Sequence, residues 1–258
     1  GRDMRLLVIQ NITQIHNLEK TRSEFIASTS HELRTPLTVI MGYLEALQEI
    51  KADDQDSEVI AAMLVQSRRM ESIIRDMLQL TKLESLQNHK ERSRRPVDIS
   101  ALIKQVYEDA AAIGANTHEI TLDVDPQINL LGIEPELHSA FTNLVQNAIR
   151  YTPEHSSIRI SWKERNNGRV RFMVEDNGPG IAAEHLSRLT ERFYRVDAGR
   201  SRDKGGTGLG LAIVKQIIKQ HDAQLLIESK PGLGSRFICE FPRHLVLNQA
   251  KPQIRAVS

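Results

Sequence analysis

Residues 28–37 of this chain read SerThrSerHisGluLeuArgThrProLeu and lie within an apolar repeat that predicts a long helix. The repeat places apolar side chains three and four residues apart, at Ile26, Leu33, Leu37, Ile40, Leu44 and Leu47. Such spacing is typical of a coiled-coil helix, which buries one stripe of side chains. With Leu33 and Leu37 in that stripe, we expect His31, Glu32 and Thr35 on a solvent-facing shoulder of the helix.

These three polar residues are predicted to be neighbours on the helix surface. Thr35 follows His31 by four residues and Glu32 by three, which are the spacings of side chains that face each other. Pro36 follows and cannot donate a hydrogen bond to the carbonyl of Glu32, so we expect the helix to kink there. An exposed histidine alone indicates only a solvated face, whereas this grouping favours a reactive imidazole.

A second helix is predicted over residues 57–84, after an acidic turn at residues 53–56. It carries apolar side chains at heptad spacing, at Ile60, Met63, Met70, Ile74 and Met77. One helical hairpin, residues 14–86, cannot bury the stripes of both helices, so we expect two copies of the chain to form a dimeric four-helix bundle. Residues 5–13 are typical of a strand, and residues 1–13 are interpreted as the end of a truncated upstream domain.

Length and composition limit the classes of protein to consider. A chain of 258 residues with 40% hydrophobic and 26% charged residues favours a globular protein of two domains. Its net charge of +1 argues against a nucleic-acid partner. Cys239 is the only cysteine, which excludes disulfides and cysteine-rich metal sites and indicates a reducing compartment.

Two further predictions follow from the pattern of apolar residues. Cys239 alternates with Phe237 and Phe241, which is typical of a buried strand. No apolar stretch approaches the roughly 20 residues that cross a bilayer, so we expect this part of the protein to be cytosolic and to make no membrane contact.

Residues 87–95 are polar and basic and predict a linker that ends at Pro96. Beyond it, residues 96–244 combine helical and strand patterns, and residues 245–258 are interpreted as a C-terminal tail. Residues 157–163 and 169–175 alternate between apolar and polar side chains, and the AsnAsnGly turn at 166–168 predicts that they form a hairpin. This alternation favours an antiparallel or mixed sheet with helices on one side over a doubly wound parallel sheet.

Three polar clusters in this second domain predict a nucleotide site. The first is on a predicted helix, where Asn143 and Asn147 are one turn apart and Arg150 follows on the same face. An amide oxygen is a suitable ligand for Mg²⁺, and an arginine can neutralise phosphate. The second is AspAsnGlyProGly at residues 176–180, where a carboxylate at a strand end can accept a hydrogen bond from an exocyclic amine such as that of adenine.

The third cluster is GlyGlyThrGlyLeuGlyLeu at residues 205–211, at the start of a predicted helix over 209–221. Backbone amides at a glycine-rich helix start form a cradle for anions. The cluster matches neither the dinucleotide fingerprint of a βαβ unit nor a Walker A loop. The polar residues 181–204, between the second and third clusters, are predicted to form a mobile lid over the phosphates.

In this order, the three clusters resemble the catalytic domain of sensor histidine kinases, and HisGluLeuArgThrPro at residues 31–36 resembles their phospho-acceptor motif. GluArgPheTyrArg at 191–195 resembles the phenylalanine-containing box in the lid of that family. The resemblance implies a dimeric phosphotransfer hairpin followed by an α/β sandwich ATP-binding domain of the Bergerat (GHKL) type. It also implies a sensor domain upstream and an inner-membrane protein of which this chain is the cytoplasmic portion.

The resemblance implies roles for individual residues as well. His31 is phosphorylated, Glu32 is its base, and Thr35 positions water when the kinase dephosphorylates its partner. Asn147 holds Mg²⁺. The residues implied to contact ATP are Asn143, Asn147, Arg150, Tyr151, Asp176, Gly178, Gly180, Arg195, Gly206, Thr207, Gly208, Leu209 and Gly210. The implied partners are a second copy of the chain and the receiver domain of a response regulator, which we expect to dock at residues 43–49 and 62–70.

Two other classes of function remain open at this point. ATP hydrolases with the same nucleotide fold carry a glutamate four residues before the magnesium asparagine, whereas this chain has Asn143 there. A dimeric scaffold that only binds nucleotide is the second alternative. A zinc hydrolase is excluded, because Thr35 occupies the position of the second histidine in the HisGluxxHis motif.

Overall fold

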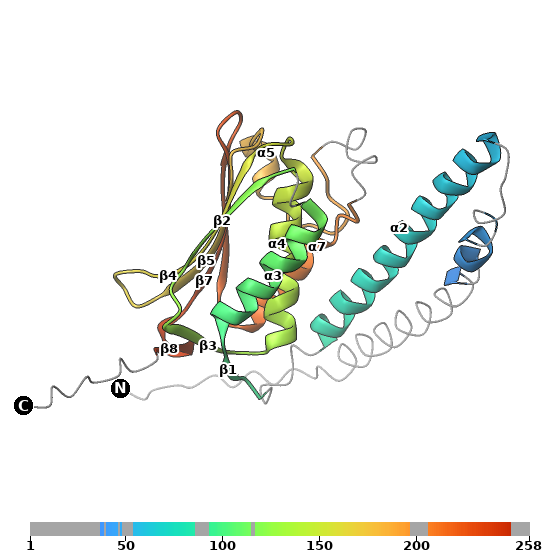
Figure 1. Ribbon diagram of the computed structural model, residues 1–258. Helices are drawn as coiled ribbons and strands as arrows, with labels where there is room; N and C mark the ends of the chain where they lie inside the picture. Colours follow the sequence, from blue (N-terminus) through green and yellow to red (C-terminus); the bar gives the residue numbers. More distant parts are fainter. Residues whose placement is uncertain are drawn as a thin grey trace, which may run out of the picture. The chain divides into compact units, whose positions relative to one another are not determined.

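The computed structural model describes residues 37–38, 40–45, 47, 54–85, 93–114, 117–196 and 206–248. The chain divides into two compact units, residues 1–88 and 89–258 (Figure 1). Within the described ranges, no helix has both the length and the apolar character that a membrane span requires. The expected strand at residues 5–13 and the residues His31, Glu32 and Thr35 lie outside the described part of the chain.

Within the described part of the first unit, the longest element is the helix α2, Asp54–Ser85. Residues 37–38, 40–45 and 47 are also helical, and Leu44 packs with Ile60 and Leu64 of α2 in an apolar cluster. The predicted second helix is confirmed, but it begins at Asp54 and not at Ser57. Asp54 and Asp56, which we assigned to a turn, belong to the first turn of this helix.

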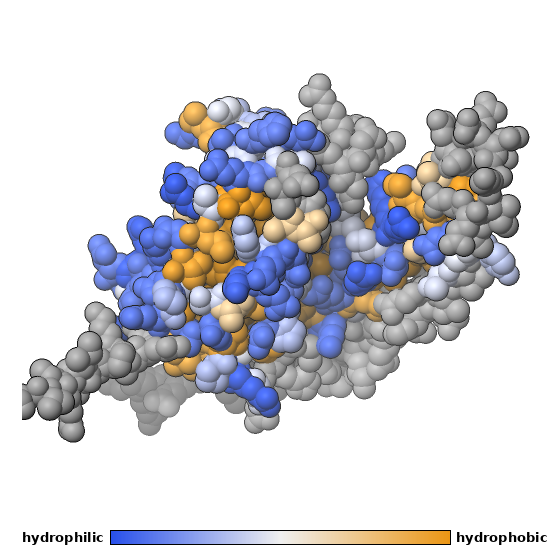
Figure 2. Space-filling view, in the orientation of Figure 1, coloured by the Kyte–Doolittle hydropathy of each residue, from blue (hydrophilic) through white to orange (hydrophobic). Residues whose placement is uncertain are grey.

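The apolar residues of α2 form two stripes. The buried stripe contains Ile60, Leu64, Leu80 and Leu83. The second stripe, Met63, Met70 and Met77, is 48%, 48% and 37% exposed, and Figure 2 shows apolar residues, in orange, on the surface of this unit. In the single chain, Ile60 of the predicted repeat is buried together with Leu64, whereas the methionines of that repeat are exposed. Pairing of two copies through the exposed stripe stays a prediction.

The described residues of the second unit form two sheets. The larger has the order β2-β4-β5-β7-β6, and its strands are Glu119–Val124, Ser157–Glu164, Val170–Asp176, Gly234–Phe241 and Gln224–Lys230. β2 pairs with β4 in parallel, and the other neighbours are antiparallel. The smaller sheet has the order β1-β3-β8, with strands Arg95–Val97, Ile128–Gly132 and Val246–Asn248. The predicted mixed sheet and the hairpin of β4 and β5 are both confirmed.

Three helices cover one face of the larger sheet (Figure 1): α3, Ile99–Gly114; α4, Glu134–Tyr151; and α7, Gly210–Gln220. The core between helices and sheet is aromatic, with Phe141 of α4 stacked on Phe172 of β5 at a centroid distance of 3.8 Å. Trp162 of β4 is fully buried, and its indole N–H donates to the carbonyl of Ile128 in the smaller sheet at 2.9 Å. The expected buried strand around Cys239 is also confirmed.

Both ends of the second unit differ from the expected boundaries. Arg95 belongs to β1 and not to a linker, because it pairs with Gly132 of β3. Residues 246–248, which we assigned to a tail, form β8 and pair with the other edge of β3. Each added strand is three residues long, too short for an alternating pattern to predict it.

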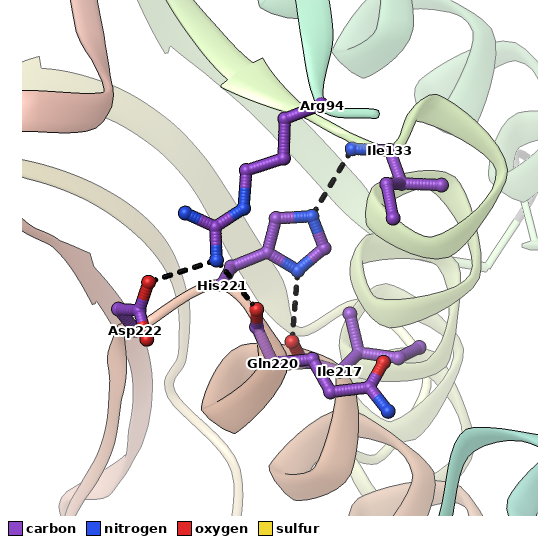
Figure 3. Close-up of polar contacts among 6 residues, drawn as sticks. All are labelled: Arg94, Ile133, Ile217, Gln220, His221 and Asp222. Atoms are coloured by element: carbon purple, nitrogen blue, oxygen red, sulfur yellow. Dashed lines mark hydrogen bonds and ion pairs between the residues drawn. The ribbon is translucent and has the colours of Figure 1, made fainter. Parts of the chain in front are cut away.

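Arg94 also belongs to this unit, since it caps the C-terminal end of α7 (Figure 3). Its guanidinium donates to the carbonyl of Gln220 at 2.7 Å and to the carboxylate of Asp222 at 2.8 Å. The last carbonyls of a helix lack partners within the helix and attract positive charge, so an arginine is favourable at this place.

The buried His221 joins α7 to the start of α4 (Figure 3). Its Nε2 accepts a hydrogen bond from the backbone N–H of Ile133 at 3.1 Å, and Ile133 is the N-cap residue of α4. The ring proton is therefore on Nδ1, which donates to the carbonyl of Ile217 at 2.9 Å. A neutral imidazole thus holds together the two helices that carry two of the three polar clusters.

We expect His221→Phe to lower the free energy of unfolding by about 2 kcal/mol, because it leaves the N–H of Ile133 without its acceptor. Urea unfolding followed by the fluorescence of Trp162, the only tryptophan, measures the change. His244→Phe, at an exposed histidine, is the control and should shift the unfolding midpoint little. Equal midpoints for the two variants would contradict a structural role for His221.

Candidate functional site

Helix α4 presents the first polar cluster on the face opposite its contacts with the sheet. The buried residues of α4 are Leu137, Ala140, Phe141, Leu144, Val145 and Ala148. With that face against the sheet, Asn143, Asn147 and Arg150 lie on a half-buried face. The amide nitrogen of Asn143 donates to the carbonyl of Ser139 at 2.9 Å, which leaves its Oδ1 directed elsewhere.

The glycine-rich cluster lies directly against this part of α4. A Cβ atom placed on Gly210 would be 2.6 Å from Oδ1 of Asn143. One placed on Gly206 would be 2.9 Å from the hydroxyl of Tyr151 and 3.3 Å from the guanidinium of Arg150. The structure thus brings the first and third clusters together, and any larger residue at Gly206 or Gly210 displaces a predicted site residue.

The described part of the expected lid, residues 181–196, contacts the same loop. Nη1 of Arg195 donates to the carbonyl of Gly206 at 2.8 Å. The backbone N–H of Phe193 donates to the carbonyl of Gly208 at 2.9 Å, and both residues have positive φ angles, +63° and +75°. A Cβ on Gly208 would lie 2.9 Å from the Cα of Phe193, so this position requires glycine for both conformation and space.

The other two predicted residues of the loop have different environments. Leu209 is buried, so its side chain belongs to the core and only its backbone can face a ligand. Thr207 is half-buried, and its hydroxyl accepts a hydrogen bond from the N–H of Leu209 at 3.2 Å. This short turn leads into Gly210, where α7 begins, so the amides at the start of α7 follow the glycine-rich turn directly.

Asp176 ends strand β5 and is 8% exposed. Burial raises the pKa of its carboxyl above the ordinary value, although the backbone N–H groups of Gly178 and Ser235 donate to it and oppose the shift. A Cβ on Gly178 would lie 2.7 Å from Cγ2 of Thr152, which directly follows α4. The second cluster therefore meets the C-terminal end of the same helix as the first.

The loop after Asp176 is held on the turn between β6 and β7. The backbone N–H of Gly232 donates to the carbonyl of Pro179 at 2.7 Å, and Gly180, with φ +69°, packs against the carbonyl of Lys230. The hydroxyl of Ser229 accepts from the N–H of Ile181 at 2.8 Å. We did not predict this turn from the sequence, although the glycines at 232 and 234 before the strand of Phe237 were a usable signal.

We expect Asp176→Asn to stabilise the protein in the absence of nucleotide at about pH 7. Because the folded-state pKa of Asp176 is raised, the folded protein loses stability as the pH rises through that pKa, and an amide carries no such cost. The gain in thermal midpoint should shrink as the pH is lowered and the wild-type carboxyl takes up its proton.

Glu240→Gln is the matched control, because this variant should lower the thermal midpoint at neutral pH, whereas Asp176→Asn should raise it. Arg169 and Arg171 donate to the carboxylate of Glu240 at 2.8 and 2.6 Å and hold its pKa below the ordinary value. The stability that this carboxylate contributes is present at neutral pH and is lost as the pH falls through its folded-state pKa. If both variants shift the thermal midpoint in the same direction at neutral pH, the assignment of the two environments is disproved.

Comparison with protein families matches two regions of the chain. Residues 21–86 match the His Kinase A (phospho-acceptor) domain. Residues 132–245 match the histidine kinase-, DNA gyrase B- and HSP90-like ATPase. The first match contains His31, Glu32 and Thr35, and the second contains the three clusters that meet at α4.

Curated relatives include two phosphate regulon sensor proteins named PhoR. The protein from Pseudomonas aeruginosa is 45% identical over 245 residues, and the one from Haemophilus influenzae is 38% identical over 253 residues. The matches cover 93% and 98% of this chain but only 54% and 59% of the relatives. The chain therefore spans somewhat more than half the length of these relatives.

Solved structures of similar proteins also match this chain. The crystal structure of full-length ShkA in complex with AMPPNP matches 89% of this chain and 47% of its own, with a TM-score of 0.71 and 30% identity. The mycobacterial sensor histidine kinase MprB matches 58% of this chain and 97% of its own, with a TM-score of 0.51 and 26% identity. Through its phospho-acceptor and ATPase domains, this chain belongs to the sensor histidine kinases.

Proposed function

We propose that this chain is the cytoplasmic catalytic core of a membrane-anchored sensor histidine kinase, which phosphorylates itself on His31 with ATP. The supporting observation is the convergence of the three clusters on the C-terminal half of α4, in a chain whose phospho-acceptor domain contains His31. The phosphoryl group then passes to an aspartate of a response regulator.

The described residues suit an adenine nucleotide. Asp176 is a buried acceptor for the exocyclic amine of the base, and Gly178 has no Cβ, which would lie 2.9 Å from Oδ1 of Asp176. Arg150 and Arg195 both lie close to Gly206, where they place positive charge at the glycine loop. Adenine is therefore assigned to the end of β5 and the phosphates to the start of α7.

Asn147 and Asn143 offer amide oxygens of the kind that Mg²⁺ prefers. Among the described residues, no group of three histidine, cysteine, aspartate or glutamate side chains gathers in one place. A magnesium ion bound mainly by phosphates and water needs no such group and would neutralise charge on the phosphates. We assign the metal contact to Asn147, with Asn143 fixed beside it by its bond to Ser139.

The chemical step needs positioning and charge neutralisation more than covalent help from the protein. One ring nitrogen of neutral His31 attacks the γ-phosphorus of ATP, the bond to the bridging oxygen breaks, and ADP leaves. Glu32 accepts the proton from the other ring nitrogen. Thr35 is assigned to positioning water in the reverse function, removal of phosphate from the response regulator.

Transfer to histidine is favoured over simple ATP hydrolysis by the residue at position 143. A hydrolase with this fold needs a carboxylate there to activate water, but an asparagine amide is no base at neutral pH. Both polar atoms of the Asn143 amide already have neighbours, because its nitrogen donates to the carbonyl of Ser139 and its oxygen faces Gly210.

The partners proposed are a second copy of the chain and a receiver domain. Met63, Met70 and Met77 form an apolar stripe suited to a second helical hairpin. Tyr43, 70% exposed, lies in one of the two segments assigned to the receiver domain, residues 43–49 and 62–70. The names of the PhoR relatives place them in the phosphate regulon, and we propose phosphate control for this protein as well.

His31→Ala should abolish the incorporation of label from γ-labelled ATP, whereas Glu32→Gln should slow it and leave the affinity for ATP unchanged. The reason is that His31 supplies the attacking nitrogen and Glu32 only accepts its proton. The protein-bound phosphate should be labile in acid and stable in alkali. Release of free phosphate without labelled protein would favour the hydrolase, and neither product would favour the scaffold.

Gly208→Ala should raise the Kd for ATP about tenfold or more, which is ~1.4 kcal/mol. The added methyl group meets the backbone of Phe193 and separates the glycine loop from the lid. Gly168→Ala is the control, since Gly168 has a similar φ of +74° but its Cβ would meet only the flexible side chain of Arg243. Calorimetric titration with ATP should show a normal Kd for the control, and an equal loss in both variants would contradict the assignment.

A further inference from the structure

Ser229, near the end of strand β6, joins three segments of the chain through one hydroxyl group. Its Oγ donates to the carbonyl of Gly234 at 2.8 Å and accepts from the backbone N–H of Ile181 at 2.8 Å. It also lies 3.0 Å from the Oγ of Ser235. Ile181 directly follows the AspAsnGlyProGly cluster and is the first residue of the predicted lid.

The direction of the hydrogen bond between the two serines follows from counting protons. The single hydroxyl proton of Ser229 is used at the carbonyl of Gly234, so Ser235 donates its own proton to Ser229. The oxygen of Ser235 can then only accept further hydrogen bonds. Ser229 therefore fixes the direction in which the hydroxyl of Ser235 donates its hydrogen bond.

Ser235 lies opposite Asp176 in the pairing of β5 with β7, and its backbone N–H donates to the carboxyl of Asp176. Both residues are buried, at 6% and 8% exposure. The end of β5 therefore combines a carboxylate with a hydroxyl whose proton is already used in the hydrogen bond to Ser229. Such a pair accepts hydrogen bonds and has none to donate, which suits an amine and disfavours a carbonyl oxygen.

We propose that Ser229 is a positioning residue for the base of the nucleotide. It holds Ile181 and the preceding loop on the turn between β6 and β7, and it keeps Ser235 oriented as an acceptor beside Asp176. The consequence is selectivity for a purine with an exocyclic amine over one with a carbonyl at the same place. The inference rests on the proposed ATP binding and extends it to a residue that does not touch the nucleotide.

The test compares Ser229→Ala and Ser229→Thr with the wild-type chain, using ADP and its 6-oxo analogue IDP. Displacement of a fluorescent ADP derivative gives both dissociation constants. Ser229→Ala should weaken ADP binding about fivefold, as expected when Ser235 is no longer held as an acceptor for one hydrogen bond from the base, and IDP binding should weaken less. The preference for ADP should therefore fall, and Ser229→Thr, which keeps the hydroxyl, should restore it. Ser93→Ala, at an exposed serine outside the candidate site, should behave as wild type.

Several results would overturn this role. An unchanged ADP affinity in Ser229→Ala, or an equal weakening for ADP and IDP, would show that the hydroxyl does not set selectivity. Failure of Ser229→Thr to restore the preference would show the same, provided that Trp162 fluorescence gives wild-type unfolding for that variant. A wild-type chain that does not bind ADP would overturn the proposed function itself, which separates that failure from failure of Ser229 alone.

Discussion

The stacking of Phe141 on Phe172 is the contact on which the geometry of the candidate site depends. It fixes α4 on the sheet in one rotational setting, because the aromatic ring on the helix faces a ring on β5 at 3.8 Å. With the apolar face of α4 fixed in this way, the side chains of Asn143 and Asn147 lie away from the sheet. A rotation of α4 by one residue would bury these amides and break the approach of Gly210 to Asn143.

The three clusters are far apart in sequence and meet because each stands at the end of an element that packs against α4. Asp176 is the last residue of β5, Gly210 is the first residue of α7, and Thr152 directly follows α4. His221 secures the same arrangement from the opposite end of α7, where it bonds to the N-cap of α4. Helix starts and strand ends leave backbone groups without partners, and such groups are available to a ligand.

The sequence predicted those elements whose side chains alternate or recur strongly. The hairpin of β4 and β5 was identified because its apolar residues alternate and an AsnAsnGly turn joins the strands. β2 was missed because it is an exposed edge strand with no alternation in burial. Arg94 was assigned to a linker because an arginine that caps a helix 126 residues away leaves no local signal. The site residues were identified from polar clusters and from the family resemblance, which also marked the box that contains Phe193. Ser229 was missed, because it acts through a hydroxyl that residue type alone does not distinguish.

Asp176 and Glu240 show most directly why the site could not be read from residue types alone. Both are acids on neighbouring strands, and both are less than 9% exposed. Two arginines hold Glu240 in its charged form, whereas Asp176 has only backbone N–H donors, and burial raises its pKa. A structural acid is given counter-charges by the fold, but Asp176 is left with acceptor capacity that the protein does not fill. A hydrogen-bond donor from outside lowers the free energy of that carboxylate more than it would at Glu240, and this difference supports the proposal that the end of β5 binds an amine.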